Sequence, residues 1–227
     1  MNFNNGPINI NLKPKQIRLS TCFLSILMAF NTFLGFGQTR VKFNAATALI
    51  LVPNVGVELP ISYNFSVQLD VLGSFWDSVG EDRDPYQVNQ TFFELRGYLS
   101  DDLNGFFYGA HIGYGMFTIQ KANALVLYDP YQDLAPYSNK NGTFQSGRAG
   151  FYGITAGWNK RLLNHWSLEL FIGGGLVQSN YKGYNGFYRV DVLPGDTREF
   201  NKSGEWVLYR GGLMLVYNIP NNKSSHE

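Results

Sequence analysis

Charged residues recur in segments of this chain where every second residue is apolar, and these side chains are the best placed for chemistry inside a fold. They are Glu58, Asp70, Glu94, Arg96, Glu169 and Arg210. In an extended strand, side chains two residues apart point to the same face, so Glu94 and Arg96 lie together. Because an unpaired buried charge costs several kcal/mol, ions on an enclosed face must pair. The spacing therefore predicts a structural network of ion pairs. The alternative is a gated polar pathway.

Catalytic chemistry has weaker support, because a nucleophile needs a base and an acid beside it. His111 lies inside a strand-like segment, His165 in a short connection and His226 in the polar tail. No two of these histidines have the spacing of metal ligands. No helix pattern follows the run Gly173 to Gly175, so this run is not a phosphate-binding loop. We therefore expect no catalytic, cofactor-binding or metal-binding residue.

The first 37 residues have the composition of a targeting segment. A basic stretch, Lys13 to Arg18, precedes an apolar run from Leu19 to Phe36, and Gly37 follows. This order of basic, apolar and small residues is typical of a secretory signal peptide. The alternative is a retained membrane helix, but polar residues interrupt the run and no cluster of charges follows it. We predict a signal peptide at residues 1–37 and one domain at residues 38–227.

The composition of residues 38–227 excludes several classes of protein. The only cysteine of the chain, Cys22, lies in the targeting segment, so the domain has neither a disulfide nor a thiol nucleophile. Removing residues 1–37 takes away three basic residues and no acidic one, which changes the net charge from +1 to about −2. A domain without excess positive charge is not expected to bind nucleic acid.

The domain consists of strand-like segments, none of which keeps the apolar spacing of a helix. The predicted strands are residues 41–52, 55–61, 65–76, 91–99, 106–119, 151–160, 166–178 and 206–218. Short connections alternate with the long ones at residues 77–90, 120–150 and 179–205, and only the link at residues 53–54 is short against this trend. Bacterial membrane barrels have an even number of strands, short turns at one end and long loops at the other. We therefore predict an all-β fold, an eight-stranded antiparallel up-and-down transmembrane β-barrel.

The side chains of these strands separate into an apolar phase and a polar phase. The apolar phase includes Val55, Val57, Phe93, Leu95, Ile112, Leu170, Ile172, Val207, Tyr209, Leu213 and Leu215. The polar phase carries the six charged residues with many glycines. In a bilayer the apolar phase faces lipid and the charged phase fills a narrow interior. Aromatic residues fall near both ends of the strands, as in the interfacial girdles of membrane barrels. A soluble lipocalin-like ligand-binding barrel, with the two phases reversed, is the competing fold.

Short sequence blocks give the chain a family resemblance. The blocks are Pro53 to Glu58, Phe65 to Asp70, Glu94 to Tyr98, Gly109 to Gly113, Gly153 to Trp158 and Trp166 to Glu169. In order and spacing they resemble a family of small Gram-negative outer-membrane beta-barrel proteins catalogued as a domain of unknown function. The likeness covers most of Val41 to Ile219. The resemblance implies a barrel fold and a place in the cell outer membrane, and it implies no activity.

These observations predict a small outer-membrane protein with a structural or surface-interaction role rather than an enzyme. Its expected partners are outer-membrane lipid, the barrel-assembly machinery, and a surface protein or glycan bound through residues 120–150 and 179–205. The Tyr, Asp and Arg side chains of those two segments suit recognition, and they equally suit loops that pack on each other. The competing classes are an outer-membrane lipid-modifying enzyme and the soluble ligand-binding barrel.

Overall fold

The computed structural model describes residues 39–77, 85–119, 126–128, 143–191 and 199–220. The predicted signal peptide lies outside these residues. The strands are β1 (Arg40–Asn44), β2 (Asn54–Pro60), β3 (Phe65–Asp77), β4 (Pro85–Tyr98), β5 (Gly105–Ile119), β6 (Val126–Tyr128), β7 (Thr143–Arg161), β8 (Trp166–Asn185), β9 (Tyr188–Arg189) and β10 (Asn201–Asn218). A short helix α2 (Ala45–Leu49) follows β1, and a 3-10 turn η1 (Asp101–Leu103) follows β4. Within the described ranges, no helix is long and apolar enough to cross a membrane.

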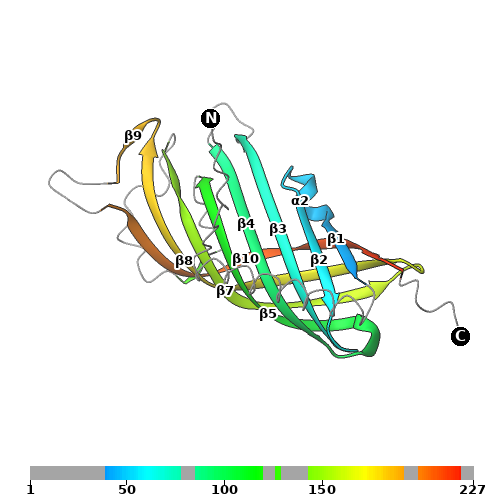
Figure 1. Cartoon of the computed structure of the whole chain (residues 1–227). Helices are drawn as coiled ribbons and strands as arrows, with labels where there is room; N and C mark the ends of the chain where they lie inside the picture. The colour runs from blue at the N-terminus through cyan, green and yellow to red at the C-terminus, as the bar shows by residue number, and fades with distance from the viewer. Residues whose placement is uncertain (1–38, 78–84, 120–125, 129–142, 192–198, 221–227) are drawn as a thin grey trace, which may run out of the picture. The chain divides into compact units, whose positions relative to one another are not determined.

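Eight of the described strands form one closed antiparallel ring (Figure 1). Each pairs with the next along the chain, in the order β1, β2, β3, β4, β5, β7, β8 and β10, and β10 pairs with β1. Tight connections join β2 to β3, β4 to β5 and β7 to β8 at the short-turn end, and the other links lie at the opposite, long-link end. The short strands β6 and β9 pair with β10 and β8. The predicted all-β, antiparallel fold is confirmed, while the crossing of a membrane stays a prediction.

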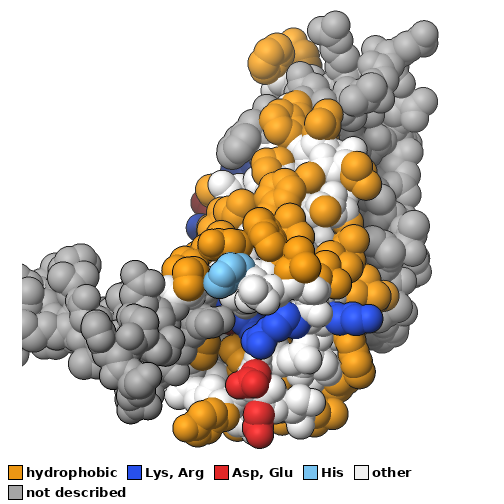
Figure 2. Space-filling model, turned by 90° about the vertical axis from the view of Figure 1, so that its right-hand side faces the viewer, with side chains coloured by type: hydrophobic (Ala, Val, Ile, Leu, Met, Phe, Trp, Pro, Cys, Tyr) orange, Lys and Arg blue, Asp and Glu red, His pale blue; other side chains and the backbone are white. Residues whose placement is uncertain are grey.

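The ring has polar side chains inside and apolar side chains outside. In β1, Arg40, Lys42 and Asn44 are buried, whereas Val41 and Phe43 between them are exposed. The same alternation continues in β2, where Glu58 is fully buried. Figure 2 shows hydrophobic side chains covering much of one outer face. Because strand side chains alternate, one backbone course produces both surfaces.

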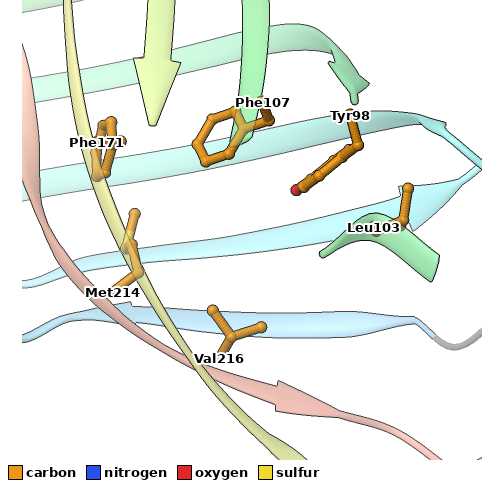
Figure 3. Packing of buried hydrophobic residues seen from close by; sticks show 6 residues of the cluster. All are labelled: Tyr98, Leu103, Phe107, Phe171, Met214 and Val216. Carbon is orange, nitrogen blue, oxygen red and sulfur yellow. The ribbon is translucent and has the colours of Figure 1, made fainter. Parts of the chain in front are cut away.

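Three layers of side chains occupy the interior from the short-turn end to the middle of the ring, and β4 contributes to each of them. The first apolar layer, near the short-turn end, consists of Tyr98, Leu103, Phe107, Phe171, Met214 and Val216 (Figure 3). Next along β4 come Arg96 and Glu94, which belong to a charged layer. The second apolar layer consists of Phe92, Ala149 and Phe151, with Phe117, Val177 and Tyr209 packed against them. The charged side chains are therefore enclosed between two apolar layers.

The turn between β4 and β5 closes the short-turn end. Asp102 and Leu103 have φ values of 62° and 52°, the left-handed region that L-residues rarely occupy. This course brings the Leu103 side chain into the first apolar layer. Arg40 holds the turn by donating hydrogen bonds to the carbonyl oxygens of Leu103 and Asp102, at 2.8 and 3.0 Å. Such backbone strain persists only where surrounding contacts determine it.

The predicted strand at residues 41–52 is wrong beyond Asn44, because residues 45–49 are helical. The Asn44 side chain accepts hydrogen bonds from the backbone N–H groups of Ala46 and Thr47, at 3.2 and 3.3 Å, which makes it the N-cap of α2. The alanines that follow are strong helix formers. The sequence carried this signal, a capping Asn before an Ala-rich stretch, but the apolar run beside it resembled a strand.

Four strands extend further towards the long-link end than predicted. Strand β4 begins at Pro85, β7 at Thr143 and β10 at Asn201, while β8 continues to Asn185. The predicted loop at residues 179–205 therefore contains strand at both ends, and the one at residues 120–150 contains β6 and the first part of β7. Residues 120–125, 129–142 and 192–198 of these loops lie outside the described residues. Periodicity failed there because the apolar phase becomes polar, with Ser146, Arg148, Asn180 and Lys182 at its positions. Apolar alternation marks only the part of a strand whose two faces differ in polarity.

A β-bulge in β10 corrects the predicted orientation of Val207 and Tyr209. Leu208 is opposite Gly174 and Arg210 is opposite Gly173, so Tyr209 is an extra residue in this strand. Tyr209 packs in the second apolar layer, and Val207 is opposite the inward-facing Gly175. The sequence prediction placed both residues in the outward phase, because it assumed an unbroken strand. One extra residue in β10 moves the side chains that precede it in this strand to the face opposite to the one predicted.

Candidate functional site

The six charged residues predicted as a network all point into the ring, from five different strands. Glu58 lies on β2, Asp70 on β3, Glu169 on β8 and Arg210 on β10, while β4 supplies both Glu94 and Arg96. None of their side chains is more than 6% exposed. The structure thus brings together residues that lie far apart in the sequence.

Two arginines connect three carboxylates into a continuous chain across the interior. Arg96 contacts Glu169 at 2.8 Å and Glu94 at 3.1 Å. Arg210 contacts Glu94 at 2.8 Å and Asp70 at 2.5 Å. Glu94 is therefore shared by the two guanidinium groups, which are planar and present several donors in a fixed geometry.

Strand β1 supplies two cations that the sequence prediction did not include. The Lys42 Nζ atom lies 2.6 Å from Glu169 and 2.8 Å from Glu58. Arg40 lies 3.7 Å from Glu58. The signal that could have found them is the alternation of Arg40, Val41, Lys42 and Phe43, which has the same period as the other strands. With these two residues the network has four cations and four anions, so it carries no net charge.

Neutral groups complete the coordination of the carboxylates. Tyr98 and Ser66 donate hydroxyl hydrogen bonds to Glu58 at 2.7 and 2.5 Å, and Gln68 donates to Asp70 at 2.7 Å. Such hydrogen bonds replace the water that a buried carboxylate loses. Each carboxylate of the network therefore has at least one cation beside it, and Glu58 and Asp70 also accept hydrogen bonds from neutral side chains.

Glycine and aromatic residues shape the space around the charges. A Cβ atom at Gly56 would collide with the Asp70 carboxylate, and one at Gly109 would collide with that of Glu94. The guanidinium carbon of Arg96 lies 4.4 Å from the centre of the Phe107 ring. Contacts of this kind stabilise a cation electrostatically and exclude water. The two glycines therefore leave the space that the Asp70 and Glu94 carboxylates occupy, and Phe107 covers the Arg96 guanidinium.

His111 is the one histidine in the ring wall that faces inward, and its neighbours are hydroxyl groups. Its ring nitrogens lie 3.0 Å from Thr155 Oγ1 and 2.6 Å from Tyr209 Oη, and the bulge in β10 is what brings Tyr209 there. Within the described residues, no hydrogen bond joins His111 to a carboxylate, and no group of three His, Cys, Asp or Glu side chains could hold a metal ion. The absence of catalytic, cofactor and metal residues stays a prediction.

A second, smaller polar cluster lies at the long-link end. Asp191 accepts hydrogen bonds from Arg189 at 2.7 Å and from Asn201 at 2.5 Å, which ties the residues after β9 to the start of β10. Burial alone would raise the pKa of Asp191, but the hydrogen bonds from Arg189 and from the Gly183 backbone hold this pKa below its ordinary value. Beyond this cluster, the side chains of Phe187 and Tyr188 are exposed at the tip of the β8–β9 hairpin.

The fold and the site define a class: all-β proteins whose antiparallel strands close into a ring around a neutral, ion-paired interior. The chain belongs to the family described as "Protein of unknown function (DUF3575)", which matches residues 22–219. The resemblance to a family catalogued as a domain of unknown function is thereby confirmed. No curated protein and no solved structure was found to match the chain.

Proposed function

We propose that this chain is a small eight-stranded up-and-down β-barrel of the Gram-negative outer membrane, with a structural and surface-interaction role and no catalysis. The observation that carries the proposal is the distribution of side chains around the ring. Eight ionic side chains are enclosed, while apolar side chains such as those of Ile154, Leu170 and Ile172 are exposed. Soluble monomers rarely expose an apolar patch larger than a few hundred Å². In a lipid bilayer the same side chains face hydrocarbon, so their exposure carries no free-energy penalty.

Aromatic residues near the strand ends support this location. Phe65, Phe106, Trp166 and Tyr217 are exposed near the short-turn end, and Trp206 is exposed towards the long-link end. Aromatic side chains gather at both interfaces of a membrane, because their rings prefer apolar contact and their polar edges prefer the headgroup region. The expected lipid partner thus contacts the band between these two levels.

The interior is closed from the short-turn end to the charged layer, which favours a structural role over a gated pathway. The ions of the charged layer form pairs with one another. The first apolar layer closes the short-turn end, where the Leu103 side chain packs into it. Eight strands leave an interior just wide enough for side chains. The interior also gives no support to a lipid-modifying enzyme, because His111 is enclosed beside Thr155 and Tyr209 rather than placed at the rim.

Surface interaction is assigned to the long-link end, where β7 and β8 extend beyond the apolar band. Phe187 and Tyr188 stand at the tip of a hairpin that the Asp191 cluster braces. An aromatic side chain on a rigid hairpin buries area with little loss of conformational entropy, which suits binding of a surface protein or glycan. The barrel-assembly machinery is the expected partner during insertion.

Membrane fractionation with a heat-modifiability gel tests the proposal. We expect the processed protein in the outer-membrane fraction, soluble only with detergent, and migrating differently before and after boiling because the closed ring resists unfolding. A processed protein that stays in plain buffer as a compact monomer would contradict the proposal.

The surface role is tested by the double substitution Phe187→Ser with Tyr188→Ser. Unchanged binding of cells to matrix proteins, glycans and sister cells would contradict the surface role.

A further inference from the structure

The wall of the ring is much lower at β1 and β2 than elsewhere. Strand β1 has 5 residues and β2 has 7, whereas β7 has 19 and β8 has 20 (Figure 1). A tilted strand needs about 9–11 residues to cross the hydrocarbon core of a bilayer. If the tall side spans the membrane, β1 and β2 end within it, on the side of the outer leaflet.

The α2 turn, which we define as Ala45 to Leu51, occupies the place above these two strands. Asn44 connects it to the wall, because its side chain caps α2 and also donates a hydrogen bond to the Gly211 carbonyl of β10 at 3.1 Å. Beyond that contact, the edge of β10 that faces β1 carries the bulge at Tyr209 and then pairs with β6 at Trp206 and Val207. The α2 turn is therefore part of the wall.

The α2 turn exposes three consecutive apolar side chains. Leu49, Ile50 and Leu51 are 86%, 62% and 61% exposed. No charged residue occurs between Phe43 and Val57, whereas the links at residues 78–84 and 129–142 both contain several. The exposed residues Val41, Phe43, Val55 and Val57 of the strands below belong to the same apolar surface. A turn that stood in water would gain nothing from this composition.

The backbone of the α2 turn is also suited to an environment without water. The N–H group of Ile50 bonds to the Thr47 carbonyl at 3.2 Å, and that of Leu51 bonds to the Ala48 carbonyl at 3.0 Å. The Val52 N–H group bonds to the Thr47 carbonyl at 2.9 Å. An unsatisfied backbone N–H group in hydrocarbon costs several kcal/mol, so these internal hydrogen bonds are what a turn beside acyl chains requires.

We propose that the α2 turn is a lipid-docking surface: Leu49, Ile50 and Leu51 insert among the acyl chains of the outer leaflet and complete the wall above β1 and β2. The inference rests on the proposed function and adds to it that one outer link binds lipid rather than a soluble partner. The occupant follows from the shortfall in strand length, the absence of charge and the continuity with the apolar band.

Single-cysteine labelling tests this inference, because the chain without residues 1–37 has no cysteine. The variants are Ile50→Cys in the α2 turn, Ile154→Cys in the apolar band of β7, and Phe187→Cys at the β8–β9 tip, at side chains that are 62%, 72% and 101% exposed. Each carries an environment-sensitive fluorophore in nanodiscs, where both membrane faces contact the solution. Quenching by nitroxide-labelled acyl chains is compared with quenching by aqueous iodide, after a heat-modifiability gel has shown that each variant is folded.

We expect the label at position 50 to resemble the label at position 154, with quenching by the acyl-chain nitroxide several-fold stronger than at position 187. A label at position 50 that resembles position 187, while position 154 is quenched by lipid, would overturn the inference and leave the proposed function intact. Iodide quenching at all three positions would overturn both.

Discussion

The charged layer and the first apolar layer fill the same ring, yet they connect it differently. Lys42 on β1 and Arg96 on β4 both reach Glu169 on β8, so ion pairs join strands that are not neighbours. The first apolar layer instead packs side chains of β4, β5, β8 and β10 with Leu103 of the turn, through contacts that have no fixed direction. Ion pairs are directional and apolar contacts are not. The comparison suggests that the charged layer determines which strands face each other, and the apolar layer seals the end.

Removal of one shared cation is the strongest way to break the charged layer. In Arg96→Met the side chain keeps an apolar stem, but Glu94 and Glu169 each lose a partner at 3.1 and 2.8 Å. Loss of one member of a buried ion pair costs about 3–5 kcal/mol, because it leaves an uncompensated charge. We expect the free energy of unfolding by urea in micelles to fall by about 3 kcal/mol, since Arg210 and Lys42 still compensate in part.

The matched control for this variant is Arg96→Met combined with Glu169→Gln, which restores the balance of charges. We expect the double variant to recover part of the lost stability, because the polar amide needs no cation. If Arg96→Met and the unaltered protein had the same free energy of unfolding, the charged layer would not determine how the strands are arranged.

The first apolar layer should tolerate damage better. Leu103→Ala removes the side chain that closes the short-turn end, and a buried Leu→Ala change costs about 2–5 kcal/mol. We expect a value of about 2 kcal/mol, because the turn can settle towards the cavity. Leu99→Ala, four residues earlier and exposed on the outside, is the matched control and should change stability by less than about 0.5 kcal/mol. A Leu103 effect as small as that of Leu99 would mean that the turn does not seal the ring.

The two layers also differ in how far the sequence alone predicts them. Glu94 and Arg96 were found because a charge that recurs with period 2 in an apolar strand identifies the inner face. Arg40 and Lys42 were missed because their strand is short and runs directly into α2. Leu103 could not have been predicted, since its position depends on left-handed backbone in a turn. Tyr209 was placed on the wrong face because sequence periodicity gives no sign of a bulge.

Two tyrosines extend the comparison between ionic and non-ionic contacts, because the hydroxyl group of each forms a hydrogen bond with a different kind of partner. Tyr98 bonds to the Glu58 carboxylate at 2.7 Å and Tyr209 bonds to His111 at 2.6 Å. A hydrogen bond to a charged group contributes about 1.5–3 kcal/mol, and one between neutral groups contributes about 1 kcal/mol. We therefore expect Tyr98→Phe to lower the free energy of unfolding more than Tyr209→Phe does. Equal losses would show that the charge on Glu58 adds nothing to the bond.

The smallest expected effect concerns Asp191, whose cluster lies at the long-link end, away from the charged layer, and should hold only the β8–β9 hairpin and the start of β10. Because the pKa of Asp191 in the folded protein is below its ordinary value of 3.8, its contribution is present above that value and is lost as pH falls through the folded pKa. The readout is hydrogen exchange of the Val190 amide, which bonds to the Gly183 carbonyl at 3.0 Å, corrected for the intrinsic exchange rate at each pH. We expect protection to be constant from neutral pH to about pH 4 and to fall below it, and Asp191→Asn to remove this dependence without changing global unfolding.

A pH dependence that persists in Asp191→Asn would assign the bracing of the hairpin to another group. A change in global unfolding would instead mean that the hairpin and the charged layer are one cooperative unit.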